Sequence, residues 1–177
     1  GWNAYEKKDY KTARELWLPL AEQGEPKAQF FLGFMHDMGF GVPENDKKAT
    51  KWYQLAAEQG DSRAQLFTGF MYDFGKGVPK DYQKAVKWYQ LASEQGYKQA
   101  KISIYKLANK NSPEALKILL NDAENGSVEA QVNLAEMREK KLVNSEDNQK
   151  NSNQERVSEE KEYVQVGKTM LYLVQLN

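Results

Sequence analysis

Cysteine is absent from this chain of 177 residues, and histidine occurs once, as His36. Without cysteine there is neither a disulfide framework nor a thiolate metal site, and with one histidine a nucleophile–base pair is hard to assemble. Basic and acidic residues number 25 each, so the basic excess that is typical of a nucleic-acid-binding protein is missing. No apolar run has the length of a membrane span. The composition therefore predicts a protein that uses no metal or cofactor, binds no nucleic acid and does not insert into a membrane.

What the chain does contain is a repeat of 36 residues. The tetrapeptides AEQG, AEQG and SEQG end at Gly24, Gly60 and Gly96, and a related AENG ends at Gly126, only 30 residues further on. Repeats of this length are typical of solenoids, in which each unit buries its apolar face against the next. The expected divisions are a half-unit 1–24, units of about 25–60, 61–96 and 97–126, a final helix 127–140, a polar linker 141–162 and an apolar C-terminal segment 163–177.

Each unit has the pattern of two helices. Ala49, Trp52, Tyr53 and Ala56 are spaced i, i+3, i+4, i+7 and form one apolar stripe, which recurs 36 residues later. The glycine after each such helix is expected to be a left-handed cap. Helices are predicted near 9–23, 26–38, 46–59, 62–74, 82–95, 97–109, 113–125 and 127–140.

Three features of the units bear on how the helices pack. Trp52 and Trp88 are predicted core residues of the second helices. Gly33 and Gly69 lie in the middle of the first helices, where glycine costs roughly 1 kcal/mol relative to alanine, and the repeated cost indicates close approach of a neighbouring helix. The third unit has Tyr105 in the place of the glycine and lacks the G-x-G-V-P loop of the two units before it. We therefore expect the third unit to pack differently and to bend the array.

The repeated residues carry a family resemblance. The pattern A-Q-x-x-x-G-x-M-Y-x-x-G-x-G-V-P, followed by D-Y-x-K-A-V-K-W-Y-x-x-A-x-E-Q-G, resembles the Sel1-like repeat, a relative of the tetratricopeptide repeat. Residues 64–96 match it nearly position for position, residues 9–63 match well and residues 97–140 match partially. The resemblance implies an all-α, right-handed superhelical solenoid of antiparallel helix pairs that serves as a protein-interaction scaffold. The first ten residues resemble a bacterial half-repeat that follows a signal peptide, which favours a periplasmic or secreted protein over a cytoplasmic one.

An extra aromatic stripe sets the first units apart. In the related tetratricopeptide fold, the first helix of each pair lines a concave groove. The first helices of the first two full units are apolar almost all round, more than one packed face requires, and exposed aromatic patches usually mark an interface. We predict that a partner protein or peptide binds to Phe31, Phe34, Met38, Phe67, Phe70, Phe74 and Trp2.

Two other interpretations of this stripe remain open. The rings could instead fill the tight inner curve of the superhelix. Alternatively, the apolar segment 163–177 could occupy the groove, either in its own chain or in a second molecule, which would produce self-association.

The predicted function is a non-catalytic protein-binding adaptor, of which an immunity-type inhibitor of a secreted toxin is one specific form. The competing prediction is an enzyme that acts on β-lactam or cell-wall-derived compounds. Such activities are linked to some cysteine-rich relatives of the family that the chain resembles, but this chain lacks their cysteines.

Overall fold

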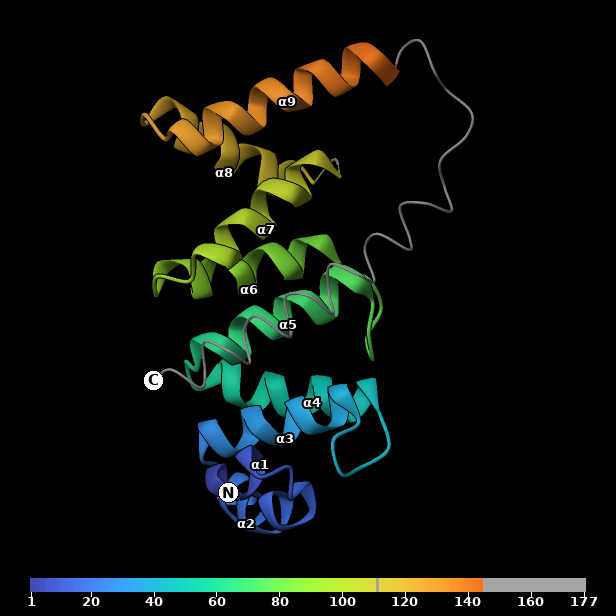
Figure 1. The fold of residues 1–177 in the computed structure, drawn as a ribbon. Helices are drawn as coiled ribbons and strands as arrows, with labels where there is room; N and C mark the ends of the chain where they lie inside the picture. Colours follow the sequence, from blue (N-terminus) through green and yellow to red (C-terminus); the bar gives the residue numbers. More distant parts are fainter. Residues whose placement is uncertain (111, 145–177) are drawn as a thin grey trace. The chain divides into compact units, whose positions relative to one another are not determined.

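The computed structural model describes residues 1–110 and 112–144, and within these ranges the chain forms nine α-helices and no β-strand (Figure 1). The helices are α1 (Trp2–Glu6), α2 (Tyr10–Glu22), α3 (Pro26–Met38), α4 (Asp46–Glu58), α5 (Ser62–Phe74), α6 (Tyr82–Glu94), α7 (Lys98–Asn109), α8 (Pro113–Glu124) and α9 (Val128–Asn144). The prediction of an all-α repeat solenoid is confirmed. Each predicted helix is present, α3 and α5 with the predicted bounds and the others with ends shifted by one to four residues, and α1 is an additional short helix.

The predicted linker and C-terminal segment fall mostly beyond this description. Helix α9 continues to Asn144 and so enters the predicted linker 141–162. The rest of that linker and the predicted apolar segment 163–177 lie outside the described residues. No helix in the described part of the chain is both long and apolar enough to cross a membrane.

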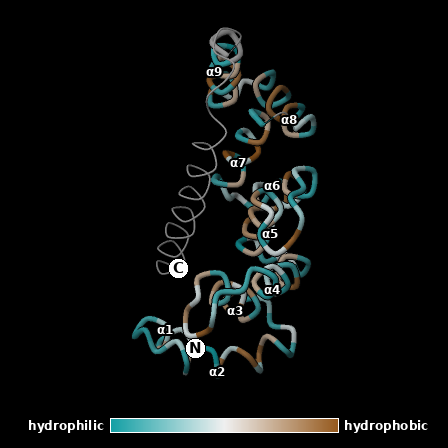
Figure 2. The backbone as a smooth tube through the Cα atoms, turned by 90° about the vertical axis from the view of Figure 1, so that its right-hand side faces the viewer, coloured by the Kyte–Doolittle hydropathy of each residue, from teal (hydrophilic) through white to brown (hydrophobic). Residues whose placement is uncertain are grey.

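Residues 1–131 form one compact part of the structure, in which the helices pack in chain order. From α1 to α8, each helix packs against the next one along the chain. Figure 2 shows that apolar stretches recur throughout residues 1–131. The core is therefore divided among successive helix pairs, which is how a repeat array is stabilised. A second compact part of the chain, distinct from the sequence repeats, begins at Val132, within α9.

The repeated glycines fix the turns between helices. Gly24, Gly60, Gly96 and Gly126 have φ angles of 94°, 91°, 91° and 86°. Residues with a Cβ rarely adopt these angles, so the predicted left-handed conformation after each second helix is confirmed.

The G-x-G-V-P loop holds a unit against the unit before it. Gly77 lies so close to the backbone of Asp46, at the start of α4, that a Cβ would not fit there. The hydroxyl of Thr50 in α4 donates a hydrogen bond of 2.9 Å to the carbonyl oxygen of Lys76 in the loop. This backbone contact explains why glycine recurs at this place in the loop.

In the first two full units, a tyrosine from the second helix packs on the glycine in the middle of the first helix. A Cβ built on Gly33 would lie 2.7 Å from Cδ1 of Tyr53. Tyr53 is fully buried, and its hydroxyl donates to Asp37 at 3.1 Å. The next unit repeats the contact: a Cβ built on Gly69 would lie 2.5 Å from Cδ1 of Tyr89, and the Tyr89 hydroxyl donates to Asp73 at 3.2 Å. The predicted close approach at the two glycines is thus confirmed.

The prediction that Trp52 and Trp88 are the core residues of these helices is wrong. Both tryptophans are only partly buried, whereas the adjacent Tyr53 and Tyr89 are fully buried. The tyrosines point at the glycines of the first helices, and successive residues of a helix point about 100° apart.

The third unit makes the same kind of hydrogen bond with the two partners exchanged. Tyr105 stands in α7 where the glycine stood, and its hydroxyl donates to Asp122 of α8 at 2.7 Å. The first helix now supplies the ring, and the second helix supplies both the acid and the fully buried Leu119 in place of the tyrosine. The expected difference in packing is present at this contact.

Replacing Gly69 by alanine should lower the free energy of unfolding by roughly 1–2 kcal/mol, because overpacking against Tyr89 outweighs the helix-propensity gain of up to about 1 kcal/mol. Chemical denaturation would measure the change. Lys87→Ala, at an exposed position of α6, is the matched control and should change the stability little. A Gly69→Ala protein as stable as the wild type would show that the tyrosine moves aside without cost.

Candidate partner-binding surface

The structure brings the predicted binding residues together from three helices. Six of the seven are aromatic, and with Phe30 they form a continuous row of rings, which we call the aromatic row. It consists of Trp2 from α1, of Phe30, Phe31 and Phe34 from α3, and of Phe67, Phe70 and Phe74 from α5. Neighbouring ring centroids along the row are 5.4–6.4 Å apart, within the range in which aromatic rings attract each other. Met38, the seventh predicted residue, is partly buried at the end of α3.

The row has buried and partly exposed members. Phe34, Phe67 and Phe70 are only 3%, 1% and 3% exposed, and Phe67 contacts the rings of Phe30, Phe34, Tyr53 and Phe70. Their burial agrees with the interpretation that these rings fill the interior of the array. Trp2, Phe31, Met38 and Phe74 each keep part of their surface exposed. Partner binding by any of the seven stays a prediction.

Ring contacts also hold α1 in place. The indole of Trp17 in α2 stacks on Phe31 at 4.6 Å and an interplanar angle of 13°. The ring centroid of Tyr5 in α1 lies 5.8 Å from that of Trp17 and 5.5 Å from that of Trp2. Burial raises the pKa of the Tyr5 hydroxyl. A helix of five residues is too short to be stable alone, so these rings hold Trp2 at the end of the row. The spacing of apolar residues in the sequence does not predict that Trp17 stacks on Phe31.

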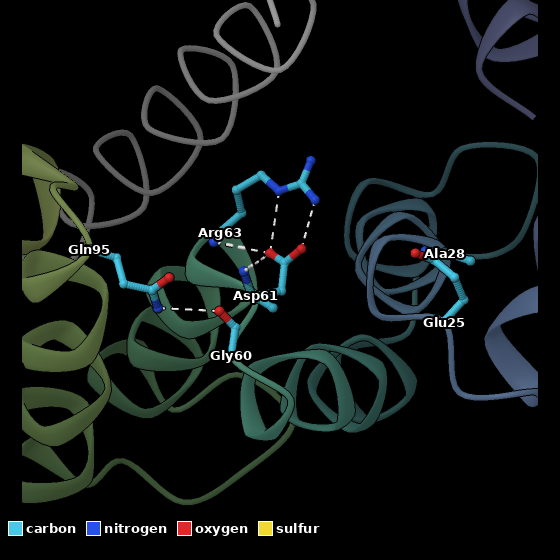
Figure 3. A network of polar contacts seen from close by, with 7 residues as sticks. Glu25, Ala28, Gly60, Asp61, Arg63 and Gln95 are labelled. Carbon is cyan, nitrogen blue, oxygen red and sulfur yellow. Dashed lines mark hydrogen bonds and ion pairs between the residues drawn. The ribbon is translucent and has the colours of Figure 1, made fainter.

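A fixed cation covers part of the row. The guanidinium carbon of Arg63 lies 4.7 Å from the centroid of the Phe30 ring and 5.6 Å from that of Phe31, which are cation–π distances. Two of its nitrogens donate to Asp61, Nη2 at 2.7 Å and Nε at 3.3 Å (Figure 3). The same carboxylate caps α5 by accepting from the backbone N–H groups of Arg63 and Ala64. Asp61 thus fixes both the helix start and the position of the cation.

Arg63 is a site residue that the sequence did not reveal. Lys27 occupies its position in the unit before, so the repeat itself gives no reason to expect a stacked guanidinium here. Tyr97, at the start of α7, is near the same group. Burial raises the pKa of the Tyr97 hydroxyl, while the charge of Arg63 and a hydrogen bond with Ser62 oppose that shift.

The glutamines of the repeat form amide relays across three helices. Gln59 donates to the side-chain oxygen of Gln29 at 2.7 Å, and Gln29 donates to the carbonyl oxygen of Ala21 at 3.1 Å. One unit later, Gln95 donates to Gln65 at 2.7 Å, and also to the carbonyl oxygen of Gly60 (Figure 3). The glutamines of the E-Q-G and A-Q segments therefore form hydrogen bonds that connect neighbouring units, since buried polar groups need partners.

His36, the single histidine of the chain, lies in α3. It is partly buried, and burial, together with the charges of Lys48 and Arg14, lowers its pKa. Asp37 and Asp73 accept hydrogen bonds from core tyrosines, which gives them a structural role. Among the described residues, no group of three or more histidine, aspartate or glutamate side chains is arranged to hold a metal ion.

Comparison with known proteins agrees with the repeat seen in the structure. The family model of the Sel1 repeat matches residues 3–25, 26–61 and 62–97. Proteins built from this repeat generally mediate protein–protein interactions on a scaffold that is not itself catalytic. A search of the curated proteins finds no match.

Two bacterial structures share the fold. A Sel1 repeat protein from Oxalobacter formigenes is 34% identical over 73% of this chain and 56% of its own, with a TM-score of 0.61. A protective antigen present in uropathogenic Escherichia coli strains is 30% identical over 87% of this chain and 33% of its own, with a TM-score of 0.57. The chain therefore spans about half the length of the first protein and a third of the second.

The pair of Asp61 and Arg63 should show a coupling energy of roughly 1 kcal/mol in a double-mutant cycle with Asp61→Asn and Arg63→Gln. The side chains are only 8% and 17% exposed, so water screens the pair less than it screens a surface pair. Asparagine preserves the helix cap, which isolates the ion pair in the cycle. Denaturant unfolding of the four proteins gives the value. A coupling near zero would mean that the stack on the phenylalanine rings holds Arg63 without help from Asp61.

Proposed function

The chain belongs to the Sel1 repeat family, and on that premise we propose that it is a non-catalytic adaptor that binds a protein or peptide partner along the aromatic row. The observation that carries the proposal is the partly exposed Phe31. Its ring stacks on Trp17, touches Trp2 and lies under the guanidinium of Arg63. A rigid aromatic group bordered by a fixed cation is the kind of anchor that dominates interface energies.

The buried rings of the row support the exposed ones. Phe34 and Phe67 meet edge to face at 6.1 Å and 89°, so the surface rings rest on a packed layer that does not need to rearrange when a partner binds. Preorganisation of this kind lowers the entropic cost of association. The proposal thus gives Trp2, Phe31, Met38 and Phe74 the direct contacts, and Phe34, Phe67 and Phe70 a supporting role at the same surface.

The double substitution Trp2→Ser, Phe31→Ser tests this surface, because it removes two partly exposed rings and leaves the buried phenylalanines in place. Wild type and variant are used as bait in extracts of the native organism, and each captured protein is then titrated in purified form. We expect the variant to bind the specific partner at least tenfold more weakly, since truncation of an anchor residue typically costs 2 kcal/mol or more, a rough figure.

The matched control removes apolar side chains elsewhere. Leu91 in α6 and Leu120 in α8 are exposed, so Leu91→Ser, Leu120→Ser should leave binding unchanged. Melting curves confirm that all three proteins fold. A folded Trp2→Ser, Phe31→Ser protein that retains every partner at full affinity would place the binding surface elsewhere.

Two narrower statements belong to the same proposal. One is that the adaptor is an immunity-type inhibitor, whose partner would be a secreted toxin. The other is that it works in the periplasm or outside the cell, which the resemblance of the first ten residues to an exported half-repeat supports. Identification of the captured partner tests the first, and fractionation of the native organism tests the second.

The competing enzymatic function has no specific observation in its favour. His36, the single histidine, is partly buried between cationic neighbours. Hydrolysis of a β-lactam or cell-wall-derived compound by purified protein, abolished by a point substitution, would establish an enzyme instead of an adaptor.

A further inference from the structure

Exposed aliphatic side chains concentrate on two helices, α2 and α9. Leu16 and Leu20 in α2 are 49% and 45% exposed, and Val128 and Val132 in α9 are 72% and 51% exposed. Among the described residues, the other two exposed leucines are single residues of α6 and α8. Two exposed aliphatic side chains one turn apart form an apolar stripe, so α2 and α9 each present such a stripe to solvent.

In the inner units, the position of Leu20 is covered. Thirty-six and seventy-two residues further on stand Ala56 and Ala92, and both are fully buried. In those units the first helix has 13 residues and packs against the second helix, whereas α1 has only 5. The rings of α1 reach Trp17 but leave Leu16 and Leu20 exposed. Helix α2 is thus a second helix that a shorter first helix covers only in part.

Helix α9 has the register of a first helix. Its A-Q pair, Ala130 and Gln131, repeats the A-Q pair at the start of α3 and α5. Gln131 donates to the carbonyl oxygen of Ala123 at 3.1 Å, as Gln29 does to that of Ala21. The A-Q pair therefore gives the position in the repeat of every other residue of α9.

In α9, the face that a second helix covers in earlier units is exposed. Val132 stands at the position of Phe30, and Ala135 stands at the position of Gly33. Tyr53 of the second helix α4 packs on both Phe30 and Gly33, and both are buried. Val132 and Ala135 are instead exposed, and the small side chain of Ala135 leaves room for a helix to approach closely.

We propose that α9 of one molecule packs on α2 of a second molecule, so that Val128 and Val132 cover Leu16 and Leu20. The two helices form an antiparallel pair, in which the first turns of α9 meet the last turns of α2. A second copy is the occupant because each helix presents the kind of face that the other lacks. The contact repeats the pairing of first and second helices inside each unit, and it goes beyond the proposed function because it uses no residue of the aromatic row.

The geometry of this contact determines the kind of assembly. Two different surfaces meet, so a pair of molecules keeps one free α2 stripe and one free α9 stripe, and further copies can add. One helix pair is a small interface, and small interfaces give weak, reversible complexes. The contact is apolar, so salt should not weaken it as it weakens an association of charges.

Sedimentation velocity of the full chain tests the proposal from about 10 µM to about 1 mM, the range in which a small interface associates. The average mass should rise with protein concentration and return to that of the monomer on dilution. The same rise should persist in about 1 M sodium chloride, where charges are screened within about 3 Å. A chain that stays monomeric at every concentration would overturn the proposal.

Two variants block one surface each. Leu16→Gln, Leu20→Gln changes α2, and Val128→Gln, Val132→Gln changes α9, with little loss of helix propensity. Each variant alone should associate at least tenfold more weakly than the wild type, because the apolar anchors of one surface are gone. An equimolar mixture should form dimers and nothing larger, since the first variant keeps its α9 stripe and the second keeps its α2 stripe.

The matched control changes the two exposed leucines outside these stripes. Leu91→Gln, Leu120→Gln, in α6 and α8, should self-associate as the wild type does. Circular dichroism checks the fold of every variant. If a double variant loses helical signal, the single substitutions Leu20→Gln and Val132→Gln replace the pairs in the same mixing experiment.

Other results would identify a different contact and overturn the proposal. If only the leucine variant is monomeric and the valine variant assembles as the wild type does, α2 packs on α2 of the second molecule. If Leu173→Gln, Leu176→Gln abolishes self-association and both stripe variants keep it, the occupant is the segment 163–177 of another copy. A mixture of stripe variants that stays monomeric excludes the pairing of α9 with α2. The capture experiment with Trp2→Ser, Phe31→Ser decides the adaptor function independently of all these results.

Discussion

The packing of a tyrosine ring on a bare glycine backbone is the contact on which the array depends. Only glycine lets Tyr53 lie flat against α3 and Tyr89 against α5. At that depth, each hydroxyl reaches an aspartate that is buried with it. A buried carboxylate without such a partner would be costly, so the glycine, the ring and the acid are useful only together. The aromatic row sits on this arrangement, because Phe30 and Phe67 both touch the Tyr53 ring.

Much of this architecture could be predicted from the sequence because its signals are local. Apolar stripes and glycine turns give the helices, and a recurring glycine in mid-helix gives the close approach. The choice between Trp52 and Tyr53 could not be made in this way, because both belong to the same stripe and only the position of Gly33, twenty residues earlier, decides which ring is buried. For the same reason the spacing placed Phe67 in the row but not at its true depth, which is set by rings from three helices. Arg63 was missed because its partners include rings of the preceding unit.

The repeated and the unrepeated residues have different tasks. Residues that recur at 36-residue intervals, such as Gln29 and Gln65, are buried and form hydrogen bonds at junctions between units. Residues that change between units, such as Lys27 and Arg63 or Phe74 and Lys110, lie nearer the surface and alter its chemistry. A repeat protein can vary its ligand without disturbing its fold because the two sets scarcely overlap. Family membership therefore identifies the scaffold, while the departures from the repeat give this chain a surface of its own.

The glutamine hydrogen bonds between units bear on how such a chain could lengthen by duplication of a unit. An in-frame duplication of 36 residues around the second unit would create a junction like those that already exist, because its glycine, tyrosine and glutamines would meet identical partners. A copy of the third unit placed behind itself would put a lysine, the counterpart of Lys101, where Gln131 now donates to the carbonyl oxygen of Ala123. Duplication of the second unit would therefore preserve the glutamine hydrogen bonds between units, whereas duplication of the third would lengthen the chain at the loss of one of them.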